Sequence, residues 1–383
     1  MPRTAAAPAA EASPRHALWV LAEGHVRVLD APERVPILIE HARALSATDL
    51  FVQVYRGGRA WYDASLADPA PYRRVVDASG HDTLADLLTA AHEAGLKVHA
   101  WVNVLSLSKN REAPILTDLG LDVVHVDRHG RSLLDYPDFE IPQPDRRTLR
   151  MGTPGLYLDP GAPGLAPHLA AVYAELLQRY PGLDGLHLDY IRYPDVLPTA
   201  PGSRFGVGLD FGYGAPTRAR FQAETGLEAP FGDVTRHAGT WDRWRRDRVR
   251  EVVALIASEA RAARPGIEIS AAVWTYSDRA YLSMGQDWRG WLEDGLIDLA
   301  VPMSYTVDDR LLRYHAEHFA NLRQQPRIIM GLGAWLFAND PARALEQMAI
   351  ARRAGITHLS LFSYDSIVAS DALFQTLTGA SPP

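Results

Sequence analysis

Cysteine is absent from this chain of 383 residues. The protein therefore forms no disulfide, uses no thiolate nucleophile and binds no metal ion through cysteine. No apolar run approaches the length that a membrane span requires. Basic residues are fewer than acidic ones: the chain has 39 lysines and arginines but 46 aspartates and glutamates. The resulting formal net charge of -7 argues against a nucleic-acid partner.

Hydrophobic residues make up 47% of the chain and charged residues 22%, which is typical of a soluble globular protein. The length suits two ordinary domains or one α/β barrel with long loops. The first fourteen residues, MPRTAAAPAAEASP, are rich in alanine and proline and lack the apolar core of a signal peptide. We predict a disordered leader over residues 1–16 and one folded domain over residues 17–380.

Short apolar segments alternate with amphipathic segments eight times along the chain. The predicted strands are residues 18–22, 50–55, 97–103, 186–190, 268–274, 299–305, 328–332 and 358–363. The predicted helices are residues 34–44, 83–94, 167–179, 241–263, 310–323 and 341–354. Glycine follows several of these helices, as it often does at a helix end. The alternation predicts a single (β/α)₈ TIM barrel rather than a two-domain Rossmann arrangement.

The segments that follow predicted strands 2, 3 and 4 are long, covering roughly residues 56–80, 104–160 and 191–239. Long loops in a compact domain are usually functional. In barrels of this kind the active site lies at the end where each strand runs into its loop. We therefore expect the site at the C-terminal ends of the strands.

The segment GLDGLHLDYIRYP, residues 182–194, predicts a buried strand that ends in a carboxylate. Alternation places His187 and Asp189 on one side of it. An ionised carboxylate is costly to bury unless it is paired or used, so Asp189 is the leading catalytic candidate. Arg192 and Tyr193 would favour its charged form. The alternatives are an Asp189–Arg192 ion pair that only closes the strand, and a His187 that packs in the core.

Polar and aromatic side chains are frequent near the other strand ends. Aromatic faces combined with amides and guanidinium groups suit the stacking and hydrogen-bonding needs of sugar rings, so a carbohydrate is the expected partner. The candidate substrate-binding residues are Gln53, Tyr55, Arg56, Trp61, Tyr62, His99, Trp101, Asn103, His187, Tyr190, Arg192, Tyr193, Trp274, Tyr305 and Trp335. Three or four of the aromatic residues are expected to be ordinary core packing instead.

Several motifs resemble one family of TIM barrels. They are QVYRGGRAWY (53–62), AHEAGLKVHAWVN (91–103), GLYLDPG (155–161), DGLHLDYIRYP (184–194), QDW (286–288), VPMSYT (301–306) and LFSYD (361–365). In this order they resemble the glycoside-hydrolase-like family 10, or DUF187, proteins of bacteria. The resemblance implies a hydrolase barrel that acts on a carbohydrate, with Asp189 at the end of strand 4, and it favours export from the cytoplasm.

Two loops depart from the family pattern. Members often have an acidic residue where this chain has Arg59, and they often carry Arg-Thr after strand 1, where this chain has Ala22-Glu23-Gly24-His25. These departures put the substrate contacts of both loops in doubt.

Glycoside hydrolysis usually needs two carboxylates. Asp189 is expected to be the ionised one, acting as nucleophile or base. Predicted strand 5 brings no acid, so the second catalytic carboxylate is sought elsewhere. The candidates are Asp365, which leads because it ends a strand within a family motif, and then Glu23, Asp287 and Asp278. Glu23 is alternatively a partner of His25 or Arg59, and Asp287 is alternatively a helix N-cap.

The sequence thus predicts hydrolysis or transglycosylation of a polysaccharide by a carboxylate mechanism, with no metal and no cofactor. Fourteen scattered histidines show no ligand spacing. One alternative is a catalytically inert barrel that binds glycans. Another is a polysaccharide lyase with Tyr305 or His99 as its base.

Overall fold

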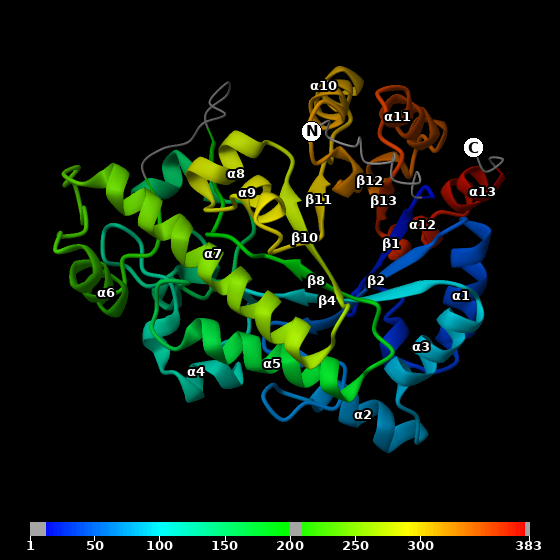
Figure 1. The fold of residues 1–383 in the computed structure, drawn as a ribbon, viewed down its shortest axis with the longest axis horizontal. Coiled ribbons are helices and arrows are strands. Elements are labelled where there is room, and N and C mark those ends of the chain that lie inside the picture. The colour runs from blue at the N-terminus through cyan, green and yellow to red at the C-terminus, as the bar shows by residue number, and fades with distance from the viewer. Residues whose placement is uncertain (1–12, 200–208, 380–383) are drawn as a thin grey trace, which may run out of the picture.

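Parallel strands form a closed barrel in the computed structural model, which describes residues 13–199 and 209–379. The barrel strands are β1 (His16–Val20), β2 (Asp49–Arg56), β4 (Lys97–Asn103), β8 (Gly185–Asp189), β10 (Glu268–Trp274), β11 (Leu299–Met303), β12 (Met330–Gly333) and β13 (Leu359–Phe362). Strand β1 pairs with both β2 and β13, and this double pairing closes the sheet (Figure 1). The predicted TIM barrel is confirmed.

Helices surround the barrel and cover its outer face (Figure 1). They are α1 (Arg34–Ala44), α3 (Thr83–Glu93), α5 (Leu165–Arg179), α7 (Ala238–Ala263), α9 (Trp288–Glu293), α10 (Asp309–Ala320), α11 (Ala342–Arg353) and α13 (Asp371–Gly379). Because β2 is covered on both faces, seven of its eight residues are buried, as expected of a parallel barrel strand. Within the described ranges, no helix combines the length and the apolarity needed to cross a bilayer.

The segments that follow β2, β4 and β8 carry structure of their own. They contain β3 (Arg59–Ala60), α2 (Ala70–Ser79), β5 (Ser106–Ser108), α4 (Pro114–Asp118), β6 (Leu149–Met151), β7 (Leu156–Tyr157), β9 (Val196–Pro198) and α6 (Ala215–Thr225). Strand β6 pairs with β9, so the segment after β4 is joined to the segment after β8. Helices α4 and α6 lie on the same side of the molecule, at the left of Figure 1.

Shorter elements complete the chain. They are α8 (Ser277–Ser283), α12 (Tyr364–Val368), and the 3₁₀ turns η1 (Val28–Asp30), η2 (Leu121–Val123), η3 (Leu133–Asp135), η4 (Pro137–Phe139), η5 (Asp145–Arg147), η6 (Gln325–Arg327) and η7 (Ala334–Phe337).

Aromatic rings fill the interior of the barrel below the strand ends. The Trp19 ring meets Phe51, Trp101 and His187 edge-on, at centroid distances of 5.2, 4.8 and 4.6 Å. His187 also stacks on Phe51 at 4.2 Å, and its Nδ1 lies 2.7 Å from Ser270 Oγ. Such packing makes the barrel a solid core, as in other TIM barrels. His187 therefore packs in the core, as the alternative interpretation expected.

A register shift in β2 changes which of its side chains face inward. Gln53 pairs with Trp101 and Tyr55 with Val102, so β2 carries one extra residue at this point. A single extra residue reverses the side to which later side chains point. Tyr55 therefore turns outward, where its ring meets Tyr173 of α5 edge-on at 5.5 Å. Simple alternation had placed Tyr55 beside Gln53.

The opposite end of the barrel is held by a buried ion-pair network. Asp49 is 1% exposed and accepts hydrogen bonds from both Arg15 and His99, while Arg15 also bonds Glu268 at 2.9 Å. Of the leader predicted over residues 1–16, residues 1–12 lie outside the described residues. Arg15 and the start of β1 at His16 are part of the barrel, because Arg15 neutralises the buried Asp49.

The network at Asp49 makes a stability prediction. Burial alone would raise the pKa of Asp49, but the hydrogen bonds from His99 and Arg15 outweigh burial and lower that pKa well below its ordinary value. Asp49→Asn should reduce the free energy of unfolding at pH 7 by about 3–5 kcal/mol, since it leaves Arg15 without its buried partner. Urea unfolding measures this loss.

The pH dependence of that loss has a definite sign. Because the pKa of Asp49 is lower in the folded state than in the unfolded state, its carboxylate stabilises the fold above the unfolded pKa of about 3.9. This stabilisation is lost as the pH falls below that value. The difference between wild type and Asp49→Asn should therefore shrink below about pH 4. The exposed Asp77 of α2 provides the control variant Asp77→Asn, which should unfold like wild type. A difference that stays constant with pH would contradict the account.

Candidate functional site

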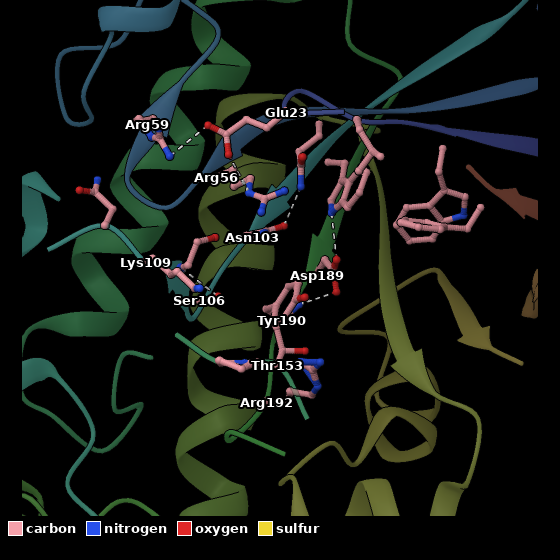
Figure 2. Close-up of a pocket in the computed structure, with 18 of the residues that line it drawn as sticks. Glu23, Arg56, Arg59, Asn103, Ser106, Lys109, Thr153, Asp189, Tyr190 and Arg192 are labelled. Atoms are coloured by element: carbon pink, nitrogen blue, oxygen red, sulfur yellow. Dashed lines mark hydrogen bonds and ion pairs between the residues drawn. The ribbon is translucent and has the colours of Figure 1, made fainter. Parts of the chain in front are cut away.

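A cavity of about 740 Å³ opens at the C-terminal ends of the barrel strands. Nine of the sequence-predicted site residues line it: Glu23, Gln53, Arg56, Trp101, Asn103, Asp189, Tyr190, Arg192 and Tyr305. They come from β2, β4, β8 and the segments after β1, β8 and β11. Figure 2 shows Asp189 and Asn103 at the centre of this group, with Glu23 on one side and Arg192 on the other.

Asp189 lies on the cavity wall at the last position of β8, and it is 6% exposed. Its Oδ2 accepts a hydrogen bond from Trp101 Nε1 at 3.1 Å, and its Oδ1 accepts one from the Tyr190 backbone N–H at 2.6 Å (Figure 2). Burial raises the pKa of Asp189, while the charge of Arg192 and these two bonds oppose the rise without cancelling it. The group thus favours its protonated form more than an ordinary aspartate does, contrary to the expectation that Arg192 and Tyr193 hold it ionised.

Tyr190 and Arg192 follow the strand in an unusual turn. Tyr190 has φ 52°, in the left-handed region that non-glycine residues seldom adopt. The turn brings its ring 4.5 Å from the Arg192 guanidinium carbon. Within the described part of the chain, Arg192 and Asp189 form no ion pair, so the purely structural ion-pair interpretation of Asp189 is wrong.

An amide pair forms the part of the cavity next to Asp189. Asn103 lies directly opposite Asp189 in the pairing of β4 with β8. Gln53 Oε1 accepts a bond from the Ala22 N–H at 3.3 Å, and Gln53 Nε2 donates to Asn103 Oδ1 at 3.2 Å. This chain of bonds orients the Asn103 amide so that its N–H groups remain as donors for a ligand.

Glu23 is held by two arginines at another side of the cavity. Its carboxylate lies 3.1 Å from Arg56 Nε and 3.0 Å from Arg59 Nη2 (Figure 2). Of the two partners considered for Glu23, the structure pairs it with Arg59. His25 instead lies 3.8 Å from Asp365. Arg59, the departure from the family pattern, thus fixes the orientation of a cavity carboxylate.

Tyr305 brings a phenol to the cavity. Its hydroxyl is buried and has no hydrogen-bond partner among the described residues. Burial, and after it the negative charge of Asp189, raises the pKa of Tyr305 well above its usual value. Trp335 meets the Tyr305 ring edge-on at 4.8 Å and is 40% exposed, so it lies beside the cavity without lining it.

Asp365 lies outside the cavity lining, beneath the segment that carries Glu23. Its Oδ1 accepts a hydrogen bond from the Val26 N–H at 2.9 Å. A Cβ on Gly24 would lie 2.0 Å from Asp365 Oδ1, so the backbone at Gly24 packs directly against the Asp365 carboxylate. Asp365 therefore supports the Glu23 segment from below.

The other candidate acids also lie elsewhere. Asp287 Oδ1 accepts from the Gly290 N–H at 3.2 Å, so it is the N-cap of α9, as the alternative interpretation had it. Asp278 is exposed in α8.

Seven further predicted binding residues line no part of the cavity: Tyr55, Trp61, Tyr62, His99, His187, Tyr193 and Trp274. Trp61 and Tyr62 are buried, with Trp61 bonded to Asp30 at 3.0 Å. His99 is bound to Asp49 at the opposite end of the barrel, away from the position of a lyase base.

Tyr193 and Trp274 have partners outside the cavity as well. Tyr193 packs on His125 at 5.0 Å and its hydroxyl bonds the Arg245 carbonyl at 3.5 Å. The Trp274 ring lies 5.0 Å from the Arg279 guanidinium carbon. Strand-end position alone did not distinguish these residues from those that line the cavity.

Thirteen lining residues were not predicted as binding residues: Trp19, Leu21, Arg59, Asp68, Ser106, Ser108, Lys109, Asn110, Glu112, Thr153, Pro154, Met303 and Phe362. Most belong to the segments after β2 and β4. The length of those segments marked them as functional, but only the folded segment after β4 brings its two ends, near residues 106–112 and 153–154, to one cavity.

Asp159 anchors the segment that carries Thr153 and Pro154. It is fully buried, and its carboxylate accepts bonds from Thr217 Oγ1 at 2.8 Å and from the Gly161 N–H at 2.9 Å. Burial raises the pKa of Asp159 to about 6, although both bonds oppose the rise. In residues 13–199 and 209–379, no group of three or more potential ligand side chains is arranged to hold a metal ion.

Comparisons with known proteins identify the relatives of this chain. The model of the family described as "Glycosyl hydrolase-like 10" matches residues 15–319. Glycosyl hydrolase DigH of Escherichia coli K12 is 25% identical over 285 residues, covering 70% of this chain and 56% of DigH. Glycosyl hydrolase YngK of Bacillus subtilis is 24% identical, covering 70% of this chain and 48% of YngK. The chain thus spans about half the length of the curated relatives it matches.

Solved structures share the fold at low sequence identity. The PgaB glycoside hydrolase domain of Bordetella bronchiseptica superposes with a TM-score of 0.64 at 16% identity, covering 97% of this chain and 100% of that domain. The catalytic domain of a β-amylase from Paenibacillus polymyxa gives a TM-score of 0.56 at 12% identity, with 97% and 100% coverage. These neighbours support the fold alone.

The buried Asp159 generates a pH prediction. Because its pKa of about 6 in the fold exceeds the unfolded value of about 3.9, the folded state binds the proton more tightly. Its contribution to stability is complete below about pH 4 and is lost as the pH rises through 6. Asp159→Asn, which keeps the shape but cannot titrate, should remove that loss. Relative to the variant, wild type should lose roughly 2 kcal/mol of unfolding free energy between pH 4 and 7.

Chemical denaturation at a series of pH values checks this prediction. The matched control is Asp122→Asn, an exposed position on the same segment. It should show the wild-type pH profile. A difference between wild type and Asp159→Asn that does not vary with pH would refute a proton on Asp159.

Proposed function

The chain belongs to the glycosyl hydrolase-like 10 family, and on that premise we propose that it hydrolyses glycosidic bonds of a polysaccharide by a metal-free carboxylate mechanism. The observation that carries the proposal is Asp189, a buried carboxyl that lines the cavity at the end of a barrel strand. Strand ends at this face supply the catalytic residues of TIM-barrel enzymes.

In the proposed reaction Asp189 is the proton donor. A general acid needs a pKa above that of an ordinary carboxyl, and burial provides such a shift at Asp189. Its proton passes to the glycosidic oxygen as the bond to the anomeric carbon breaks. The Trp101 and Tyr190 N–H groups then stabilise the carboxylate that remains.

Glu23 is the proposed second carboxylate. Its ion pairs with Arg56 and Arg59 orient it on the cavity wall. In this position it either attacks the anomeric carbon or removes a proton from the attacking water, which are the retaining and the inverting courses. Asp365 is assigned the supporting role of holding the backbone at Val26.

Asn103, Gln53 and Tyr305 are proposed to bind the sugar at the point of cleavage. The Asn103 amide, which Gln53 orients, and the Tyr305 hydroxyl, which has no partner among the described residues, supply hydrogen bonds for sugar hydroxyls. The exposed ring of Trp335 extends an apolar surface beyond the cavity, where the next sugar of a chain would stack. This arrangement favours a polymer over a free monosaccharide.

Asp189→Asn tests the proposal. We expect the variant to lose activity by about 10²- to 10⁴-fold, because the amide cannot donate the proton. Its melting temperature should stay within about 4 °C of wild type, and glycan binding should persist. The assay is release of new reducing ends from a panel of neutral, amino and acidic bacterial polysaccharides, with chelator present.

Companion variants make the result specific. Glu23→Gln should also abolish turnover, while the exposed Asp77→Asn should leave it unchanged. If Asp189→Asn folds less stably but still hydrolyses at the wild-type rate, the assignment fails. Unsaturated products would indicate elimination, and polymer binding without cleavage by wild type would indicate an inert binding barrel.

A further inference from the structure

Arg192 is a buried guanidinium that lines the cavity, and no described residue forms an ion pair with it. It is 6% exposed, and its Nε and Nη1 atoms are buried with no hydrogen-bond partner in the part of the chain that the structure describes. No carboxylate of residues 13–199 and 209–379 forms an ion pair with it. A buried charge without a partner is costly, so an unpaired arginine in a cavity indicates a place for a ligand acceptor.

The neighbouring acids are already committed to other groups. Both oxygens of Asp189 accept hydrogen bonds, from Trp101 and from the Tyr190 backbone. Asp195 lies 3.0 Å from Arg279. The Tyr190 ring lies 4.5 Å from the Arg192 guanidinium carbon, and a ring at this distance leaves the N–H edge of the guanidinium for other partners.

The other arginines of the cavity differ from Arg192 because they form ion pairs. Arg56 and Arg59 share Glu23 at 3.1 and 3.0 Å, so each of them forms an ion pair within the protein. Arg192 lies across the cavity from that pair, beside Tyr190 (Figure 2). The charge of Arg192 opposes the rise in the pKa of Asp189 and of Asp195, but among the described residues no carboxylate contacts its guanidinium. Arg192 thus differs from Arg56 and Arg59 in having no ion pair, and it lies on the side of the cavity away from Glu23.

We propose that Arg192 binds an oxyanion substituent of the sugar that lies against Asp189, so that the enzyme selects an acidic glycan. The inference rests on the proposed hydrolytic function. A guanidinium matches a planar carboxylate with parallel N–H bonds and matches a sulfate equally in charge. Thr153, which also lines the cavity, carries a hydroxyl that can donate a further hydrogen bond to an anion.

The experiment compares charged and neutralised forms of the same polymer. Uronic-acid polysaccharides are used before and after reduction of their carboxyl groups, and sulfated polysaccharides before and after desulfation. Binding is measured on Asp189→Asn, alone and combined with Arg192→Gln or Arg192→Lys, and turnover on the single variants. Arg353→Gln, at the exposed end of α11, is the matched control.

We expect the anionic form to bind on the order of 10- to 100-fold more tightly than its neutralised form. This ratio corresponds to the free energy of one charge-assisted hydrogen bond. Arg192→Gln should abolish this preference, Arg192→Lys should retain part of it, and Arg353→Gln should retain all of it. The carboxylate and sulfate arms identify which anion is bound.

The inference is overturned if no anionic polymer shows binding that depends on Arg192, or if Arg192→Gln weakens the charged and neutralised forms equally. Failure of the proposed hydrolysis would look different. In that case the polymer binds with the Arg192-dependent preference, but wild type releases no reducing ends.

Discussion

The pairing of β4 with β8 places Asn103 opposite Asp189 and Trp101 opposite His187, and the cavity depends on this register. Because the strands are parallel, the Asn103 and Asp189 side chains lie at the same height along the barrel axis. The aromatic rings below them fill the barrel interior. Trp101 belongs to both layers, since its ring packs on Trp19 and its N–H binds Asp189. A shift of one residue would turn Asp189 outward into the helix layer.

The two ends of the barrel differ in whether their buried ionisable groups form ion pairs. At the N-terminal end Asp49 is balanced by Arg15 and His99, and the network joins β1, β2 and β4. At the C-terminal end Asp189 and Arg192 are buried without forming an ion pair. Buried ionisable groups without an ion pair lower stability, and such groups cluster where a ligand and a reaction can use them.

Periodicity was sufficient to predict the barrel and the cavity floor. Apolar runs between glycines marked the strands, and β4 and β10 begin and end at the predicted residues. Tyr55 could not be placed, because the extra residue in β2 leaves no mark in the hydrophobic pattern. The positions of Lys109 and Thr153 in the cavity lining could not be predicted either. They depend on how the segment after β4 folds back through the pairing of β5 with β7. The supporting role of Asp365 could not be predicted from the sequence, because it depends on how closely the backbone at Gly24 passes the Asp365 carboxylate.

Asp189 is expected to hold a proton in the free enzyme, and a titration of its carboxyl group tests this directly. The carboxyl carbon of Asp189 is followed by NMR in protein labelled with ¹³C-aspartate, and the resonance is assigned by its loss in Asp189→Asn. We expect a titration midpoint above the ordinary aspartate value of about 3.9, because burial outweighs Arg192 and the two N–H donors. A midpoint at or below that value would show that the donors and Arg192 dominate, and would contradict the role of Asp189 as the acid.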